Sequence, residues 1–125
     1  MAMAPWQFKK MADQTSKRWA ERAWQNKLAA GFTNSATVNG DKAITMAWFS
    51  HLAMQHGMIW VGLGVLPSNT LAADRNDINW LGGTVGAYAQ SPSDGSSDEG
   101  PLPGDLETAK LLGSRVAELL TKIKE

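Results

Sequence analysis

The sequence predicts an α/β fold with a short parallel sheet, and three observations lead to this prediction. Leu28 to Thr33 and Met58 to Leu63 are short apolar runs, which are typical of strands buried on both faces. Residues 41–55, which lie between them, have the apolar spacing of a helix. The order strand, loop, helix, strand is the βαβ unit from which parallel sheets are built.

The segments around this unit complete the predicted element order. Residues 5–25 are expected to form one helix that begins at Pro5, because apolar residues recur there at steps of three and four. Residues 84–89 are expected to form a further short strand. Asp105 is expected to begin a final helix that ends near Lys124.

Two helices carry predicted buried faces. Asp41 is predicted to cap the helix over residues 41–55 with its side chain. The buried face of that helix is predicted to hold Ile44, Trp48 and Leu52. The buried stripe of the final helix is predicted to hold Leu112, Val116, Leu119, Leu120 and Ile123.

Composition limits the chemistry and the partners. The 125 residues suit one domain. Twelve Lys and Arg balance twelve Asp and Glu, which argues against nucleic acid or an anionic membrane as the main partner. The lack of cysteine excludes disulfides and zinc–thiolate sites, and no metal site is predicted. No apolar run reaches the roughly 18 residues of a membrane span, and no signal-peptide core begins the chain, so we expect a cytoplasmic protein.

Ligands of parallel sheets bind beyond the carboxyl ends of the strands. In this chain the rule points to residues 34–40, after the first strand, and to the region after Gly64. Residues 34–40 offer backbone N–H groups, small side chains and a following helix N-terminus, which together suit a flat polar group. A plain strand-to-helix connection has the same features, so the residues alone leave both interpretations open.

The order of short motifs along the chain resembles one family. Five motifs follow one another at near-family spacing: Asp13-Gln14-Thr15, Trp19, Lys27-Leu28-Ala29, Phe32-Thr33 and His56-Gly57-Met58-Ile59. This order resembles the WrbA-type family of flavodoxin-like NAD(P)H:quinone oxidoreductases. The resemblance covers nearly all of this chain but only the later half or more of the family's length. It implies a single incomplete flavodoxin-like domain over residues 1–125, a three-layer α/β/α unit with a short parallel sheet that lacks the first strands.

The resemblance also implies a cofactor, a reaction and an assembly. These are bound FMN, two-electron reduction of quinones with NAD(P)H as co-substrate, and a homo-oligomer with flavin sites at subunit contacts. The family holds the flavin ring through backbone groups of a glycine-rich loop. The residues that match this loop are Asn34, Ser35, Ala36, Thr37, Val38, Asn39 and Gly40. Gly40 alone keeps one of the closely spaced glycines.

Two further residues are carried over by resemblance. His56 matches a family histidine near the flavin ring and is the candidate catalytic residue, because imidazole can change its charge near neutral pH. A histidine at a helix end also often caps the last carbonyls, and both interpretations stay open. Trp19 matches a family tryptophan that approaches the flavin from a neighbouring subunit. The alternative is a packing residue in the core or at an interface.

The family's first strand and its Ser/Thr-rich phosphate loop have no counterpart in this sequence. Because N–H groups at a helix N-terminus supply much of the affinity for a phosphate, we expect the chain alone to bind FMN weakly or not at all. One hypothesis is a truncated quinone oxidoreductase; the other is a non-catalytic oligomerising remnant without flavin. A separate chain could also supply the missing N-terminal half. We expect self-association through the exposed strand Leu28 to Phe32.

Two other motifs lack residues that the sites they suggest would need. Gly62-Leu63-Gly64 begins a G-x-G, but Pro67 stands where a dinucleotide fingerprint needs its third glycine. Ser35, His56 and Asp41 could be drawn as a hydrolase triad, but no nucleophile elbow accompanies them.

Overall fold

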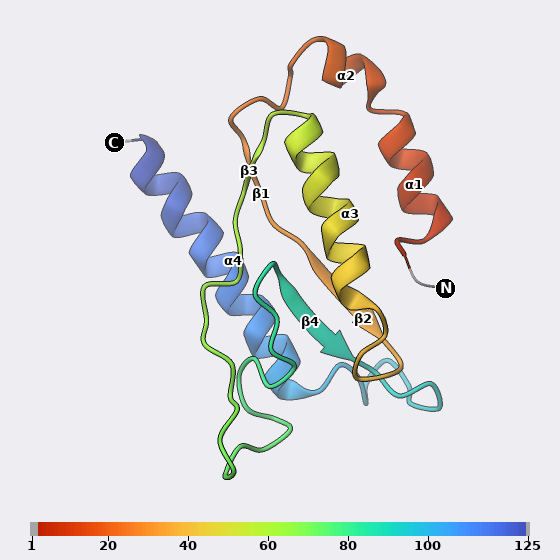
Figure 1. Cartoon of the computed structure of the whole chain (residues 1–125), viewed down its shortest axis with the longest axis vertical. Coiled ribbons are helices and arrows are strands. Elements are labelled where there is room, and N and C mark those ends of the chain that lie inside the picture. Colours follow the sequence, from red (N-terminus) through yellow and green to blue (C-terminus); the bar gives the residue numbers. More distant parts are fainter. Residues whose placement is uncertain (1–2, 125) are drawn as a thin grey trace.

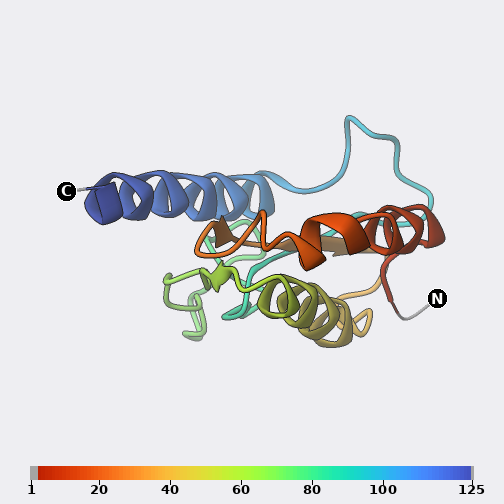
Figure 2. The same cartoon turned by 90° about the horizontal axis from the view of Figure 1, so that it is seen from above.

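The chain folds into three layers, with strands between two helices. A computed structural model describes residues 3–124. The elements are α1 (Trp6–Asp13), α2 (Ser16–Ala20), β1 (Leu28–Ala29), β2 (Phe32–Ser35), α3 (Lys42–Gln55), β3 (Ile59–Trp60), β4 (Ala87–Gln90) and α4 (Pro103–Lys124). Helix α4 lies on one side of the strands and α3 on the other, as the view from above shows (Figure 2). Within residues 3–124, no helix is long and apolar enough to cross a membrane.

One extended segment, residues 28–35, pairs in turn with two different strands. β1 is parallel to β3, with Leu28 opposite Ile59, and β2 is parallel to β4, with Phe32 opposite Ala87. The predicted parallel pairing is therefore confirmed, but the regular strands are shorter than predicted. After β3 the chain leaves the sheet for a long loop and returns only at β4, so the second half of the ladder is supplied by a separate segment (Figure 1).

The N-terminal segment is not the single helix that its spacing predicts. It breaks between α1 and α2, where the Thr15 hydroxyl donates a hydrogen bond to the Ala12 carbonyl at 2.6 Å. After α2, Arg22 and Asn26 adopt left-handed backbone angles, with φ of 55° and 63°, and end helical structure. The same hydroxyl also contacts the end of α3, and this tertiary contact fixes a turn that local spacing did not predict.

The buried face of α3 also differs from the prediction. Met46 and Ala53 are buried, whereas Ile44 is 50% exposed and Trp48 and Leu52 are only partly buried. Apolar residues occur on every side of this helix, so the spacing of Ile44, Trp48 and Leu52 did not define one face. Contact with β2 and β3 selected the face that is buried.

Helix α4 is longer than the strands that it covers and extends beyond them. Leu112 is buried against Leu63 and Ala87, as predicted for the start of its apolar stripe. Farther along, Leu120 and Ile123 are exposed, because the 22-residue helix is about 33 Å long and the short strands end before it does (Figure 1).

Candidate functional site

The loop between β2 and α3 is built around the ammonium group of Lys42. Lys42 is the first residue of α3 and its side chain is buried. Its Nζ donates hydrogen bonds to the carbonyl oxygens of Thr37 and Val38, both at 2.8 Å, and to that of Asn39 at 3.5 Å. Burial lowers the pKa of the Lys42 ammonium from its usual value, and the Asp105 carboxylate opposes part of this shift. One cation thus holds three consecutive carbonyls inward.

This arrangement turns the backbone donors of the loop outward. The C=O and N–H of one peptide group point in opposite directions, so the amides of Val38, Asn39 and Gly40 point away from Nζ. Gly40 has a φ of +52°, and a Cβ at this position would lie 1.9 Å from Ser35 Oγ. Only glycine fits there. The loop therefore presents N–H groups that can donate to electron-rich atoms of a flat ligand.

Side chains at the end of β4 hold the loop in place. Gln90 Nε2 donates to the Ala36 carbonyl at 3.0 Å, and Asn34 Nδ2 donates to Ser91 Oγ at 2.9 Å. The Ser91 amide donates to the Ser35 carbonyl at 3.2 Å. The predicted ligand loop is thus tied to the carboxyl end of the sheet from two strands.

The predicted cap of α3 is wrong in its chemistry. Asp41 stands at the N-cap position, but its side chain makes no capping hydrogen bond. Its backbone is left-handed, with a φ of 50°, whereas a capping side chain normally needs an extended backbone. The turn is closed instead by the Lys42 amide, which donates to the Asn39 carbonyl at 3.2 Å.

His56 ends α3 and is 3% exposed. Its Nε2 lies 2.8 Å from Thr15 Oγ, whose only proton is donated to the Ala12 carbonyl. Nε2 must therefore carry a proton, and in the neutral ring Nδ1 is left as a bare acceptor. Nδ1 is buried and has no hydrogen-bond partner among the described residues. The interpretation of His56 as a helix cap is wrong, because its ring bonds the turn between α1 and α2 rather than a carbonyl of α3.

Trp19 and His56 share one hollow of about 360 Å³ between α1, α2 and α3. Trp48 of α3 and Gln55 also line it. Trp19 is 47% exposed, which excludes the interpretation of Trp19 as a core residue. An exposed indole on the wall of a hollow suits a flat ligand. Among residues 3–124, no group of three His, Asp or Glu side chains is placed to hold a metal ion.

The structure does not bring the two halves of the predicted site together. Residues 34–40 lead into the start of α3 and His56 follows its last residue, so the two lie at opposite ends of this helix (Figure 1). The 14 residues of α3 separate them by about 20 Å. A single flavin ring cannot contact both sets within one chain. The same distance rules out a triad of Ser35, His56 and Asp41.

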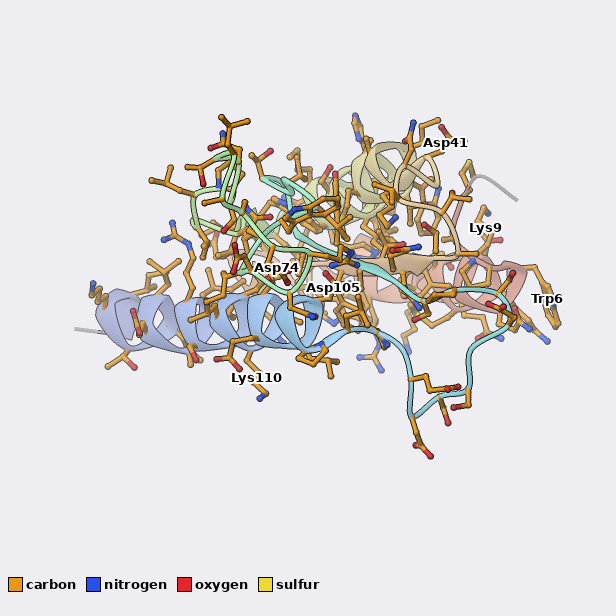
Figure 3. The ribbon with its side chains drawn as sticks, turned by 90° about the horizontal axis from the view of Figure 1, so that it is seen from below. Trp6, Lys9, Asp41, Asp74, Asp105 and Lys110 are labelled. Atoms are coloured by element: carbon orange, nitrogen blue, oxygen red, sulfur yellow. The ribbon has the colours of Figure 1, made fainter. Side chains whose placement is uncertain are left out.

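Sequence reasoning missed three residues that shape this region. Lys42 could have been identified from the sequence, because a cation in the first turn of a helix is unfavourable next to the positive end of the helix dipole and therefore indicates a special role. Thr15 had none, because its partner is 41 positions away. Asp105 was predicted only to begin a helix. It is 3% exposed, binds Arg75 with two bonds of 2.7 and 2.9 Å, and stands at the start of α4 (Figure 3).

The contact between Thr15 and His56 leads to a first testable prediction. Thr15→Val removes the hydroxyl and keeps the shape, so the Nε2–H of His56 loses its acceptor inside the protein. We expect the free energy of unfolding to fall by about 1–2 kcal/mol, measured by urea denaturation. Thr70→Val, in an exposed loop, is the matched control and should change little. Equal effects of the two substitutions would contradict this role of Thr15.

Comparisons with known proteins agree on one family. No established family model matches the sequence. The chain is 55% identical over 119 residues to flavodoxin FldP of Pseudomonas aeruginosa, a match that covers 95% of this chain and 64% of that protein. It is 33% identical over 117 residues to an NAD(P)H dehydrogenase (quinone) of Archaeoglobus fulgidus, covering 94% of this chain and 52% of the other.

A solved structure gives the same answer for the fold. The crystal structure of the flavodoxin, WrbA-like protein from Agrobacterium tumefaciens matches with a TM-score of 0.70 and 40% identity. The match covers 98% of this chain and 60% of the other. The chain therefore spans between about half and two thirds of the length of these relatives. The α/β fold and the resemblance drawn from the sequence are both confirmed, and the chain belongs to the WrbA-type flavodoxin-like family.

Proposed function

We propose that this chain acts within an FMN-dependent NAD(P)H:quinone oxidoreductase that is a homo-oligomer. The observation that carries the proposal is the loop of residues 34–40, whose carbonyls are held inward by Lys42 and whose amides face outward. Family membership supports the same proposal, since one relative is named flavodoxin and another NAD(P)H dehydrogenase (quinone).

The residues fit one part of FMN and not the other. The outward amides of Val38, Asn39 and Gly40 suit the electron-rich edge of the flavin ring. A phosphate group is usually held by N–H groups where a strand leads into a helix N-terminus. Among the described residues, β2 leads into α3 through such a junction, but we assign its loop to the flavin ring. Helix α1 cannot offer a second junction of this kind, because no described strand precedes it. We therefore assign the ring contact to this chain and no phosphate contact.

FMN, when bound, supplies the two-electron hydride chemistry. The chain's own residues bind and orient the flavin ring and the substrate. The amides of residues 38–40 donate to the ring edge, and Lys42 keeps them in that direction. In the hollow between α1, α2 and α3, the Trp19 indole can pack against the flat face of a substrate, while the His56 ring, held by the Thr15 hydroxyl, forms part of the wall.

The separation of about 20 Å between the loop of residues 34–40 and His56 is the reason why we propose an oligomer. Because His56 and Trp19 lie about 20 Å from the loop of their own chain, they would face a flavin ring held by another copy. The homo-oligomer is thus part of the proposed site, since each copy supplies ring contacts to one flavin and substrate contacts to a second.

A flavin titration followed by tryptophan fluorescence tests the proposal. We expect weak but saturable quenching, with FMN no tighter than riboflavin, because the chain provides ring contacts only. Gly40→Ala should abolish the quenching, since its Cβ would collide with Ser35 Oγ. Gly113→Ala, where a Cβ meets nothing within 4 Å, is the matched control and should bind like the parent chain. No quenching by either flavin at millimolar concentration would contradict the proposal.

One observation favours a second candidate, a non-catalytic oligomerising module. Phe32 is 74% exposed on β2, a strand that has a strand neighbour on one edge only among the described residues, and this is an unusual place for a large aromatic residue. A colourless oligomer by light scattering, together with no flavin quenching, would support this candidate over the first.

A further inference from the structure

One carbonyl of the ligand loop is held by a side chain other than Lys42. The Ala36 carbonyl accepts a hydrogen bond from Gln90 Nε2 at 3.0 Å. This carbonyl belongs to the same peptide group as the Thr37 amide, and the C=O and N–H of one peptide group point in opposite directions. The Thr37 amide therefore points away from the Gln90 side chain. No backbone carbonyl among residues 3–124 accepts a hydrogen bond from it, so it is available to a ligand.

The direction of the Gln90 amide is fixed by a cation on its other side. Gln90 Oε1 accepts a hydrogen bond from Arg75 Nη2 at 3.4 Å. A reversed amide would place its NH₂ group against the guanidinium and its oxygen against the Ala36 carbonyl oxygen, and neither pair could form a hydrogen bond. Only the observed orientation gives both ends of the Gln90 side chain a partner.

Arg75 is itself held in place by residues before and after β4. The Asp105 carboxylate, at the start of α4, accepts two bonds from the guanidinium at 2.7 and 2.9 Å, and the Trp80 ring lies 5.3 Å from the guanidinium carbon (Figure 3). Asp105 Oδ2 also accepts a bond from the Gln90 backbone amide at 2.9 Å. Gln90 is thus fixed at its backbone and at both ends of its side chain.

We propose that Gln90 is a positioning residue of the ligand loop. It orients the Thr37 amide as a fourth donor beside those of residues 38–40, and Arg75 fixes the direction in which the Gln90 side chain acts. The identity of the ligand, a flavin ring, rests on the proposed function. The orientation of the Thr37 amide rests only on the contacts of Gln90.

Two substitutions of Gln90 test this role in the full 125-residue chain. Gln90→Glu keeps the length of the side chain, the contact with Arg75 and the backbone bond to Asp105, but it puts a carboxylate oxygen against the Ala36 carbonyl in place of the donor. Gln90→Met removes both side-chain bonds at similar volume. The second variant keeps the test valid if the first one does not fold.

The first measurement is the NMR order parameter of each backbone amide in the free chain. In both variants the value for Thr37 should fall from about 0.85, typical of rigid backbone, to about 0.6 or below, while Asn39 and Gly40, on the side of the loop held by Lys42, should keep their values. The second measurement is riboflavin binding by tryptophan fluorescence. Loss of one donor should weaken it by about three- to tenfold.

Gln25→Glu is the matched control. Gln25 Oε1 also accepts a hydrogen bond from an arginine, Arg22 Nε at 3.3 Å, but both side chains are exposed and lie outside the loop. This variant makes the same chemical change beside a guanidinium. It should leave the order parameter of Thr37 and the affinity for riboflavin as they are in the parent chain.

Two results would overturn the proposal. The first is an unchanged order parameter of Thr37 in both Gln90 variants. The second is a loss of order that extends equally to Asn39 and Gly40, which would mean that Gln90 stabilises the fold and does not orient one amide. A parent chain that binds no riboflavin, with Thr37 disordered in the variants, would contradict the proposed function and leave the orienting role of Gln90 supported. A parent chain and variants that bind riboflavin equally would contradict the role of Thr37 as a donor and leave the proposed function intact.

Discussion

Replacing Lys42 with methionine should lower the free energy of unfolding by about 2–3 kcal/mol, because three carbonyls lose a charge-assisted donor at once. Methionine fills a similar volume, so the loss reports the hydrogen bonds rather than a cavity. Urea denaturation measures the change. Amide exchange of residues 36–40 should also speed up, because the cation that holds their carbonyls is gone.

Lys110→Met is the matched control for this prediction. Lys110 is on α4, its side chain projects from the outer face of that helix, and it forms an exposed ion pair with Glu107 (Figure 3). Such pairs contribute little, so the control should change stability by no more than about 0.5 kcal/mol. If Lys42→Met behaves like the control and leaves amide exchange in the loop unchanged, the ammonium does not organise the loop.

The second large effect is expected at Asp105, which joins the start of α4 to the end of β4. Its carboxylate accepts two bonds from Arg75 and one from the Gln90 amide at 2.9 Å. Asp105→Ala leaves the Arg75 guanidinium without its counter-charge and the Gln90 amide without an acceptor. We expect a loss of about 3–5 kcal/mol in the free energy of unfolding.

The matched control replaces an acid that has no such partners among residues 3–124. Asp98 lies in the exposed loop before α4, and Asp98→Ala should be nearly neutral. Asp105→Asn keeps the shape and one acceptor oxygen, and it should fall between the two alanine variants. Loss of stability in Asp105→Ala without detachment of β4, seen as unchanged amide exchange at residues 87–90, would contradict the proposed junction.

Much of the site chemistry could be read from local sequence because it depends on local backbone. The loop of residues 34–40 follows a strand and precedes a helix, and that order alone placed it at the carboxyl end of a parallel sheet. Gly40 was the retained glycine, and its left-handed φ explains why. The direction of the amides could not be predicted, since it depends on the Lys42 side chain folding back onto the loop.

The sequence by itself determined the class of fold, the parallel pairing of residues 28–35 and the position of the ligand loop, because apolar runs and helical spacing act over a few residues. Only the tertiary structure decided that Thr15 breaks the first helix and that Arg75 and Asp105 join. These features depend on contacts between residues 30 or more positions apart, which local sequence patterns cannot indicate.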